Sequence, residues 1–286
     1  MQITLEDIQL SRRKYKNPYA HLNGDGGLDA APAQHIDLGT ENKINKSTAI
    51  KHTPPNKPVR RSAKEIESLV VKFQNEMWRN YKKLHAASPS DPLELLDPEL
   101  AFNYLGYDFQ YMNASLHYTE GDELIEVGAF LDESSKQVRV AVNSNEGTTR
   151  FTAAHELGHA LLHNAPAFHR DRGLDGQKSS KPRDQFEYEA DKAATFFLMP
   201  GKIVVKEFQQ RFESCILNIT EETCSALSPK VYEEFMSGTL NKKELYKTLA
   251  CIDQYGQNNF VPLFNKFRVS SSAMAIRLEE LRLIAL

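Results

Sequence analysis

Two histidines and a glutamate near the middle of the chain have the types and spacing of a metal-dependent hydrolase. Residues 151–163 read FTAAHELGHALLH and contain the pattern HExxH, formed by His155, Glu156 and His159. On a helix, side chains four residues apart lie one above the other, so both imidazoles can reach a single metal ion. Glu156 follows the first histidine, where its carboxylate can take a proton from a bound water molecule. The spacing therefore predicts two metal ligands and a general base.

A downstream acidic segment offers the third ligand. Glu187 and Asp191 are four residues apart in FEYEAD, and this spacing puts both on one helical face. A catalytic zinc commonly takes two histidines and one carboxylate, with a fourth position left for water. We expect Glu187 to be the third ligand and Asp191 to accept a hydrogen bond from a ligand histidine. Glu189 points elsewhere on the helix and is the alternative ligand.

Simpler interpretations of these side chains remain open. The acidic segment could be a charged helix face paired with Arg183 and Lys192. His163 continues the histidine stripe by one turn, about 12 Å along the axis from His155, so it is either a partly buried helix-end histidine or a group near the substrate. Zinc suits two imidazoles and a carboxylate, although manganese and iron also accept this set.

Composition limits the class of protein. The 286 residues are 41% hydrophobic and 26% charged, with a formal net charge of -3, which is typical of a globular protein and argues against a surface built wholly for nucleic acid. No apolar run is long enough to cross a bilayer, and the N-terminal residues do not resemble a secretory signal. The three cysteines show no CxxC spacing, which favours free thiols in a reducing cytosol. We expect a cytoplasmic protein.

The metal motifs fall within the central of three predicted regions. Residues 1–61 are rich in Asn, Gly, Pro, Lys and Asp and are expected to form a disordered arm or linker, with a partner-binding or nucleic-acid-binding tail as the alternative. Residues 62–201 form the predicted metallopeptidase core, and 202–286 a helical C-terminal region. Helical and strand periodicity predicts the following elements: a helix capped by Ser62 and Glu65, a short helix over 91–106, strands at 107–112, 124–131 and 137–142 with DESSK as a hairpin loop, and helices at 149–164 and 185–198.

These elements predict an α+β fold. A small, mostly antiparallel sheet is expected beside the HExxH helix and a second ligand-bearing helix, with a helical C-terminal region. Gly158 lowers the stability of the HExxH helix but allows another backbone to approach closely. The strand 138–142, just before that helix, could pair with an extended substrate by strand addition.

The order of four segments resembles the ImmA/IrrE family of metallopeptidases. These are LGYDFQY, GAFLDESSKQVRVAVNS, RFTAAHELGHALLH and EYEADKAATFFLMP, and the resemblance extends over about 91–286. It implies zinc held by His155, His159 and Glu187, with Glu156 as the catalytic residue. It also implies a protein substrate, a helix-turn-helix transcriptional repressor. Family members often have Asn where this chain has Asp191.

A competing hypothesis comes from residues 263–281, which could form two short helices at a sharp angle. That is the outline of a helix-turn-helix, with Arg268, Arg277 and Arg282 as possible phosphate contacts. The chain would then be a DNA-binding or repressor-docking regulator with a structural or vestigial metal site. Glu279 and Glu280 lie on the supposed recognition helix, so nucleic acid is possible but not favoured.

Overall fold

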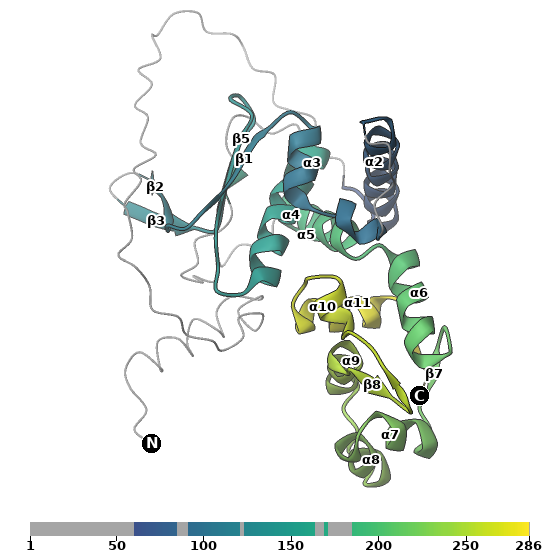
Figure 1. Cartoon of the computed structure of the whole chain (residues 1–286). Coiled ribbons are helices and arrows are strands. Elements are labelled where there is room, and N and C mark those ends of the chain that lie inside the picture. The colour runs from purple at the N-terminus through teal and green to yellow at the C-terminus, as the bar shows by residue number, and fades with distance from the viewer. Residues whose placement is uncertain (1–59, 85–90, 121–122, 164–168, 171–184, 286) are drawn as a thin grey trace, which may run out of the picture.

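The computed structural model describes residues 60–84, 91–120, 123–163, 169–170 and 185–285. Two crossing helices occupy the centre of the upper part, α4 (Glu146–Leu162) and α5 (Gln185–Leu198). In Figure 1 the strands of the upper part lie to the left of this pair, α2 (Ala63–Leu84) to the right, and the C-terminal helices below. The predicted arm lies outside the described residues except for Arg60 and Arg61. Within the described ranges, no helix is long and apolar enough to cross a membrane.

The HExxH helix begins earlier than predicted because Asn145 caps it. The side chain of Asn145 accepts a hydrogen bond of 3.1 Å from the backbone N–H of Thr148, so the helix starts at Glu146 rather than at Thr149. At the other end it stops at Leu162, and His163 has an extended backbone. The helix thus spans 17 residues and carries the whole HExxH motif in its second half.

The two central helices cross at a glycine. A Cβ added at Gly158 would lie 2.8 Å from both the Cα and the carbonyl oxygen of Ala190, and 3.1 Å from the Cβ of Ala193. The predicted close backbone approach at this glycine is therefore confirmed. Small buried residues on both sides, Ala154 and Ala194 among them, let α4 and α5 pack without a gap. This contact fixes how far the HExxH motif lies from the acidic residues of α5.

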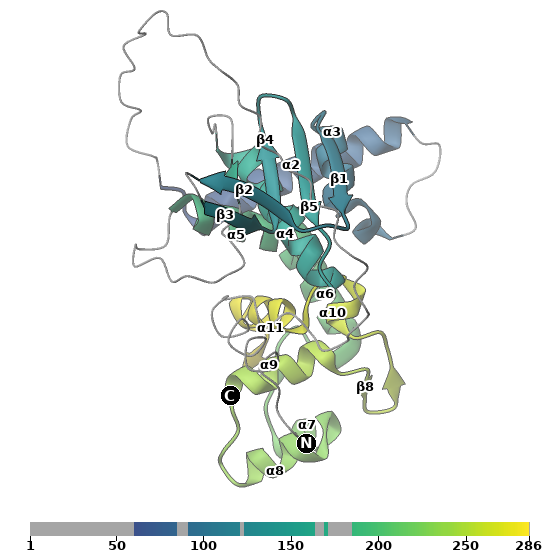
Figure 2. The same ribbon diagram turned by 90° about the vertical axis from the view of Figure 1, so that its left-hand side faces the viewer.

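A mixed four-stranded sheet packs against α4, in the order β1–β5–β4–β6. Strands β1 (Asp108–Met112) and β5 (Gln137–Ala141) are parallel, whereas β4 (Ala129–Asp132) pairs antiparallel with β5 and with β6 (His169–Arg170). The predicted hairpin between β4 and β5 is confirmed. Figure 2 shows these strands in front of α4 and α5.

Two predictions about the strands are wrong. The single strand expected at 124–131 is broken at Gly128 into β3 (Glu123–Val127) and β4, and β3 pairs antiparallel with β2 (Leu116–Glu120), which the periodicity did not reveal. In addition, β5 cannot accept a substrate strand along its described length, because β1 and β4 occupy both of its edges.

The predicted N-terminal capping box is confirmed. The backbone N–H of Ser62 donates to Glu65 at 2.7 Å, and the N–H of Glu65 donates to the Ser62 hydroxyl at 3.4 Å. The helix that follows, α2, packs against α5. The next predicted helix is split into a 3-10 helix, η2 (Pro92–Leu95), and α3 (Pro98–Tyr104). Asp91 and Asp97 cap these pieces, each followed by a proline that favours a new helix start.

The C-terminal region is mainly helical, as predicted, with two additional pairs of very short strands. The pairs are β7·β10, which is parallel, and β8·β9, which is antiparallel. The elements are α6 (Gly201–Phe212), β7 (Leu217–Asn218), α7 (Glu221–Leu227), α8 (Pro229–Met236), α9 (Lys242–Cys251), β8 (Gln254–Tyr255), β9 (Asn258–Asn259), α10 (Leu263–Lys266), α11 (Ser271–Glu280) and β10 (Ile284–Ala285).

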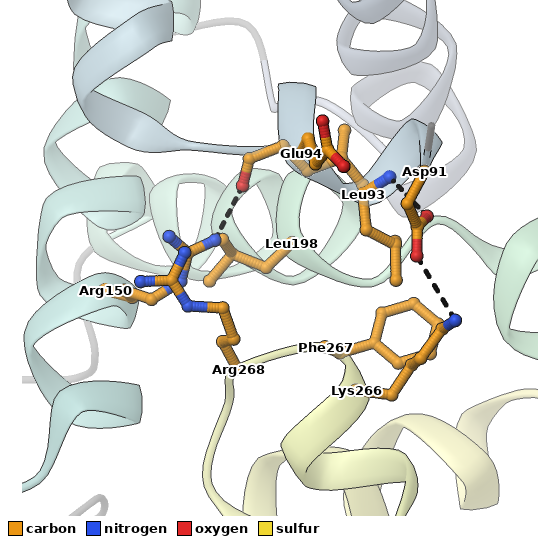
Figure 3. A pocket seen from close by; sticks show the side chains of 9 residues that line it. Asp91, Leu93, Glu94, Arg150, Leu198, Lys266, Phe267 and Arg268 are labelled. Atoms are coloured by element: carbon orange, nitrogen blue, oxygen red, sulfur yellow. Dashed lines mark hydrogen bonds and ion pairs between the residues drawn. The ribbon is translucent and has the colours of Figure 1, made fainter. Parts of the chain in front are cut away.

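The core and the C-terminal region meet around a hollow of about 200 Å³. Figure 3 shows Asp91 pointing toward Lys266, at 3.2 Å, and Arg268 lying beside Arg150. Backbone packing closes the same junction, because a Cβ at Gly147 would lie 2.6 Å from the backbone nitrogen of Ser270. The first turn of α4 is therefore held directly against the turn between α10 and α11.

Candidate active site

Helix α4 places its two motif histidines with their rings facing one metal-sized site. The Nε2 atoms of His155 and His159 lie 3.0 Å apart, and both side chains are buried. Their ring centroids are 4.8 Å apart. The spacing of four residues has the predicted consequence, since both imidazoles point their Nε2 atoms to the same side of the helix.

Glu187 completes the cluster from the first turn of α5. Its Oε2 lies 3.3 Å from Nε2 of His155, and its Oε1 lies 3.6 Å from Nε2 of His159. One ligand atom from each of the three residues falls within 4.8 Å of the others. The structure therefore brings together the three predicted ligands.

The donor set fits a zinc ion. Ligand atoms about 2.0–2.1 Å from a tetrahedral zinc lie about 3.3 Å from one another, close to the separations of the three donors. Two imidazoles and one carboxylate also leave a fourth position for water or substrate, as in catalytic zinc sites. In this structure the carboxylate of Glu187 is partly exposed, with 18% of its side chain accessible, whereas both histidines are more deeply buried.

Glu156 is fully buried, with 0% of its surface exposed, directly after the first histidine. Burying a carboxylate is costly in free energy, and an ordinary core position on α4 would hold an apolar side chain instead. Its neighbour Leu157 is such a residue and is equally buried. The acid at position 156 is thus typical of a chemical role and not of helix packing.

The hydrogen bond predicted between Asp191 and a ligand histidine is present. Its Oδ1 lies 3.0 Å from Nδ1 of His155. Because Nε2 of this histidine faces the metal site, its proton belongs on Nδ1, and the ring donates to the carboxylate. Such a hydrogen bond fixes the tautomer and orientation of a metal-binding imidazole.

The alternative ligand, Glu189, lies away from the three-residue cluster. Its carboxylate accepts hydrogen bonds from the backbone N–H of Arg61 (2.9 Å), the guanidinium of Arg61 (2.8 Å) and the side-chain amide of Gln185 (2.7 Å). Burial acts to raise the pKa of Glu189, but the hydrogen bonds from Arg61 and Gln185 outweigh it and lower the pKa. The carboxylate therefore stays ionised beside the site.

His163 links this second carboxylate to the cluster. It lies at the helix end, as predicted, but at 7% exposed it is more deeply buried than the partly buried histidine that was expected. Its Nδ1 lies 3.0 Å from Nδ1 of His159, and its Nε2 lies 3.4 Å from Oε2 of Glu189. Helical spacing places His163 on the histidine stripe, but neither of these contacts could be predicted from it.

With this geometry established, comparison with known families is informative. Residues 103–215 match the model of the Peptidase_M78 family, described as the IrrE N-terminal-like domain. The matched segment contains the HExxH helix and the ligand-bearing part of α5. A comparison with curated proteins finds no match.

The Peptidase_M78 match confirms the resemblance to the ImmA/IrrE family over residues 103–215 and indicates a metallopeptidase-like role for that segment. The match is shorter than the resemblance drawn from the sequence. It begins within α3 and stops before β7, so α7 to α11 lie beyond it. The segment predicted to be a helix-turn-helix is therefore not part of the matched domain.

The predicted helix pair at the C-terminal end exists, but one of its arginines is not free for phosphate. Arg277 on α11 is 3% exposed; its Nε donates to the carbonyl of Met199 at 3.0 Å, and its guanidinium lies 4.9 Å from the ring centre of Phe196. Arg268 is exposed but pairs with Glu146 of α4. Arg277 is therefore a packing residue, and its prediction as a phosphate contact is wrong.

Proposed function

We propose that this protein is a zinc-dependent endopeptidase that cleaves a cytoplasmic regulatory protein. The observation that carries the proposal is the convergence of His155, His159 and Glu187, whose ligand atoms lie within 4.8 Å of one another beside the buried Glu156. The Peptidase_M78 match over the same residues supports hydrolysis of peptide bonds. A helix-turn-helix transcriptional repressor is the proposed substrate, on the strength of the resemblance to the ImmA/IrrE family.

A zinc ion, when bound, supplies a water molecule of lowered pKa and polarises the scissile carbonyl. Glu156 accepts the proton of the attacking water and returns it to the leaving amine. His155 keeps the tautomer needed for metal binding because its Nδ1–H is held by Asp191. Burial of Glu156 and of both histidines fixes these groups before substrate arrives, which lowers the reorganisation required during the reaction.

A direct DNA-binding function is the weaker alternative. The exposed side chains of α11 are Ile276, Glu279 and Glu280, an apolar and acidic set that repels a phosphate backbone. Such a face is better suited to a protein surface. We therefore assign α10 and α11 a docking or packing role within the proposed peptidase.

The test is cleavage by full-length protein in which Glu156 is replaced. Glu156→Gln keeps the size of the side chain but cannot take a proton, so cleavage of helix-turn-helix repressors should fall by about 10²–10⁴-fold, while bound zinc is unchanged. Mass spectrometry of the products measures cleavage, and elemental analysis measures zinc. Cleavage at the wild-type rate by Glu156→Gln would contradict the proposed mechanism.

A further inference from the structure

A chain of hydrogen-bonding groups runs outward from one metal ligand to the start of the described structure. It begins at His159, passes through the ring of His163 to the carboxylate of Glu189, and ends at Arg61. Three parts of the fold contribute to it: α4 and its C-terminal cap, α5, and the residues just before α2. Glu189 and Arg61 are 128 residues apart in the sequence.

The protons in this chain have one consistent arrangement. Nε2 of His159 faces His155 and Glu187, so its proton lies on Nδ1 and is donated to Nδ1 of His163. A neutral His163 then carries its proton on Nε2, from which it points to Oε2 of Glu189. Each ring therefore donates in the outward direction, and the carboxylate at the end accepts.

The carboxylate of Glu189 is held in position to accept the hydrogen bond from His163. Its side chain is 1% exposed and is bound by two donors of Arg61 and by Gln185. A buried carboxylate without such partners would be costly. The ring of His163 is also fixed, because it packs edge-on against Phe186, with centroids 4.7 Å apart. These contacts allow the hydrogen-bond chain to set the orientation of the His159 ring.

We propose that Glu189, fixed by Arg61, positions the metal ligand His159 through the intervening ring of His163. This inference rests on the proposed metal site and assigns three positioning residues to it. The two ligand histidines then differ: His155 is oriented by a carboxylate directly, whereas His159 is oriented by a carboxylate acting through a second imidazole. Substituting outer-shell partners of metal ligands typically weakens metal binding by about 10–100-fold.

The experiment measures zinc affinity of the full-length chain by competition with a chelator. His163→Ala and Glu189→Ala, which removes the acceptor, should weaken binding within the range of about 10–100-fold. Arg61→Ala should cause a smaller loss, because the backbone N–H at this position still binds Glu189, and Arg61→Lys should restore part of it. Arg60→Ala is the matched control: it removes an equal charge from the exposed preceding residue and should bind zinc like the wild type.

The spectrum of the cobalt-substituted protein separates positioning from simple stabilisation. Loss of the hydrogen-bond chain should alter the visible bands of bound cobalt, because these bands report ligand geometry. If the three residues had a purely structural role, their substitution would lower the melting temperature and leave the bands unchanged. Wild-type zinc affinity and cobalt spectra in Glu189→Ala and Arg61→Ala would overturn the inference while leaving the metal site intact. A wild-type chain that binds no zinc would overturn the proposed function as well. If Glu189→Ala does not fold, the zinc affinity and cobalt spectrum of Arg61→Ala test the inference instead.

Discussion

At the scale of single residues, three ligand side chains form the site, with the carboxylate of Asp191 next to His155 and that of Glu189 next to His163. The preference of catalytic zinc for two histidines and one carboxylate pointed to Glu187, and helical spacing placed His155 and His159 together, because steps of four residues share a face. The same rule placed Glu189 off that face, but it could not say what its carboxylate would meet. Its main partner, Arg61, lies 128 residues away in the sequence, and only the folded chain brings the two together.

The side chain of Asp191 gives a prediction about hydrogen-bond chemistry. Asp191→Asn keeps an oxygen that can accept from Nδ1 of His155, so zinc affinity should remain close to that of the wild type. Asp191→Ala removes the acceptor and should weaken zinc binding by about 10–100-fold. Competition with a chelator measures both. Equal losses in the two variants would show that the hydrogen bond is not what matters at this position.

The helices and strands set the distances between these side chains. Most of the core helices could be predicted because their apolar residues recur at steps of three and four, as for Ile66, Val70, Phe73 and Met77 on α2. The strands were harder to predict. The break at Gly128 depends on β3 pairing with β2 while β4 pairs with β5, and such long-range choices leave little trace in a local pattern.

The crossing of α4 and α5 predicts that replacing its glycine by alanine changes the stability of the fold in the opposite direction from the usual one. In a solvent-facing helix, replacing Gly by Ala stabilises the fold by about 1 kcal/mol. Gly158→Ala should instead destabilise, by about 1–3 kcal/mol, because the new Cβ would meet the backbone of Ala190 at 2.8 Å.

Urea unfolding of the metal-free protein measures the change at Gly158. Thr152→Ala, at a half-buried position on the same helix, is the control for helix propensity and should be neutral or slightly stabilising. A gain in stability from Gly158→Ala would mean that the two helices are not in close contact.

For the chain as a whole, the C-terminal region is built onto the metal-binding core by specific contacts. Arg277 of α11 reaches the end of α5 at Met199. Arg268 binds Glu146 at the first turn of α4, and Lys266 binds Asp91 before η2. Hydrophobic patterning predicted that this region is helical, but not which arginines would be buried, since a helix-turn-helix outline and a packed helix pair share the same pattern.

Two arginines distinguish these possibilities. Arg277→Ala should lower the free energy of unfolding by about 2–4 kcal/mol, because it leaves a cavity beside Phe196 and removes the donor to Met199. Arg282→Ala changes an exposed side chain and should stay within about 0.5 kcal/mol of the wild type. Chemical unfolding measures both values. A strong loss of salt-dependent DNA binding in Arg282→Ala, with the fold intact, would instead revive the DNA-binding hypothesis.

The most decisive measurement is the metal content of the purified full-length protein, for the wild type and for His155→Ala and Glu187→Ala. The arrangement of His155, His159 and Glu187 predicts about one zinc per wild-type chain and loss or strong weakening in both variants. A wild-type chain that takes up no zinc even after reconstitution would contradict the metallopeptidase function. Retention of full zinc in Glu187→Ala alone would contradict the assignment of Glu187 as the third ligand. The alternative ligand, Glu189, is bound to Arg61 in the structure.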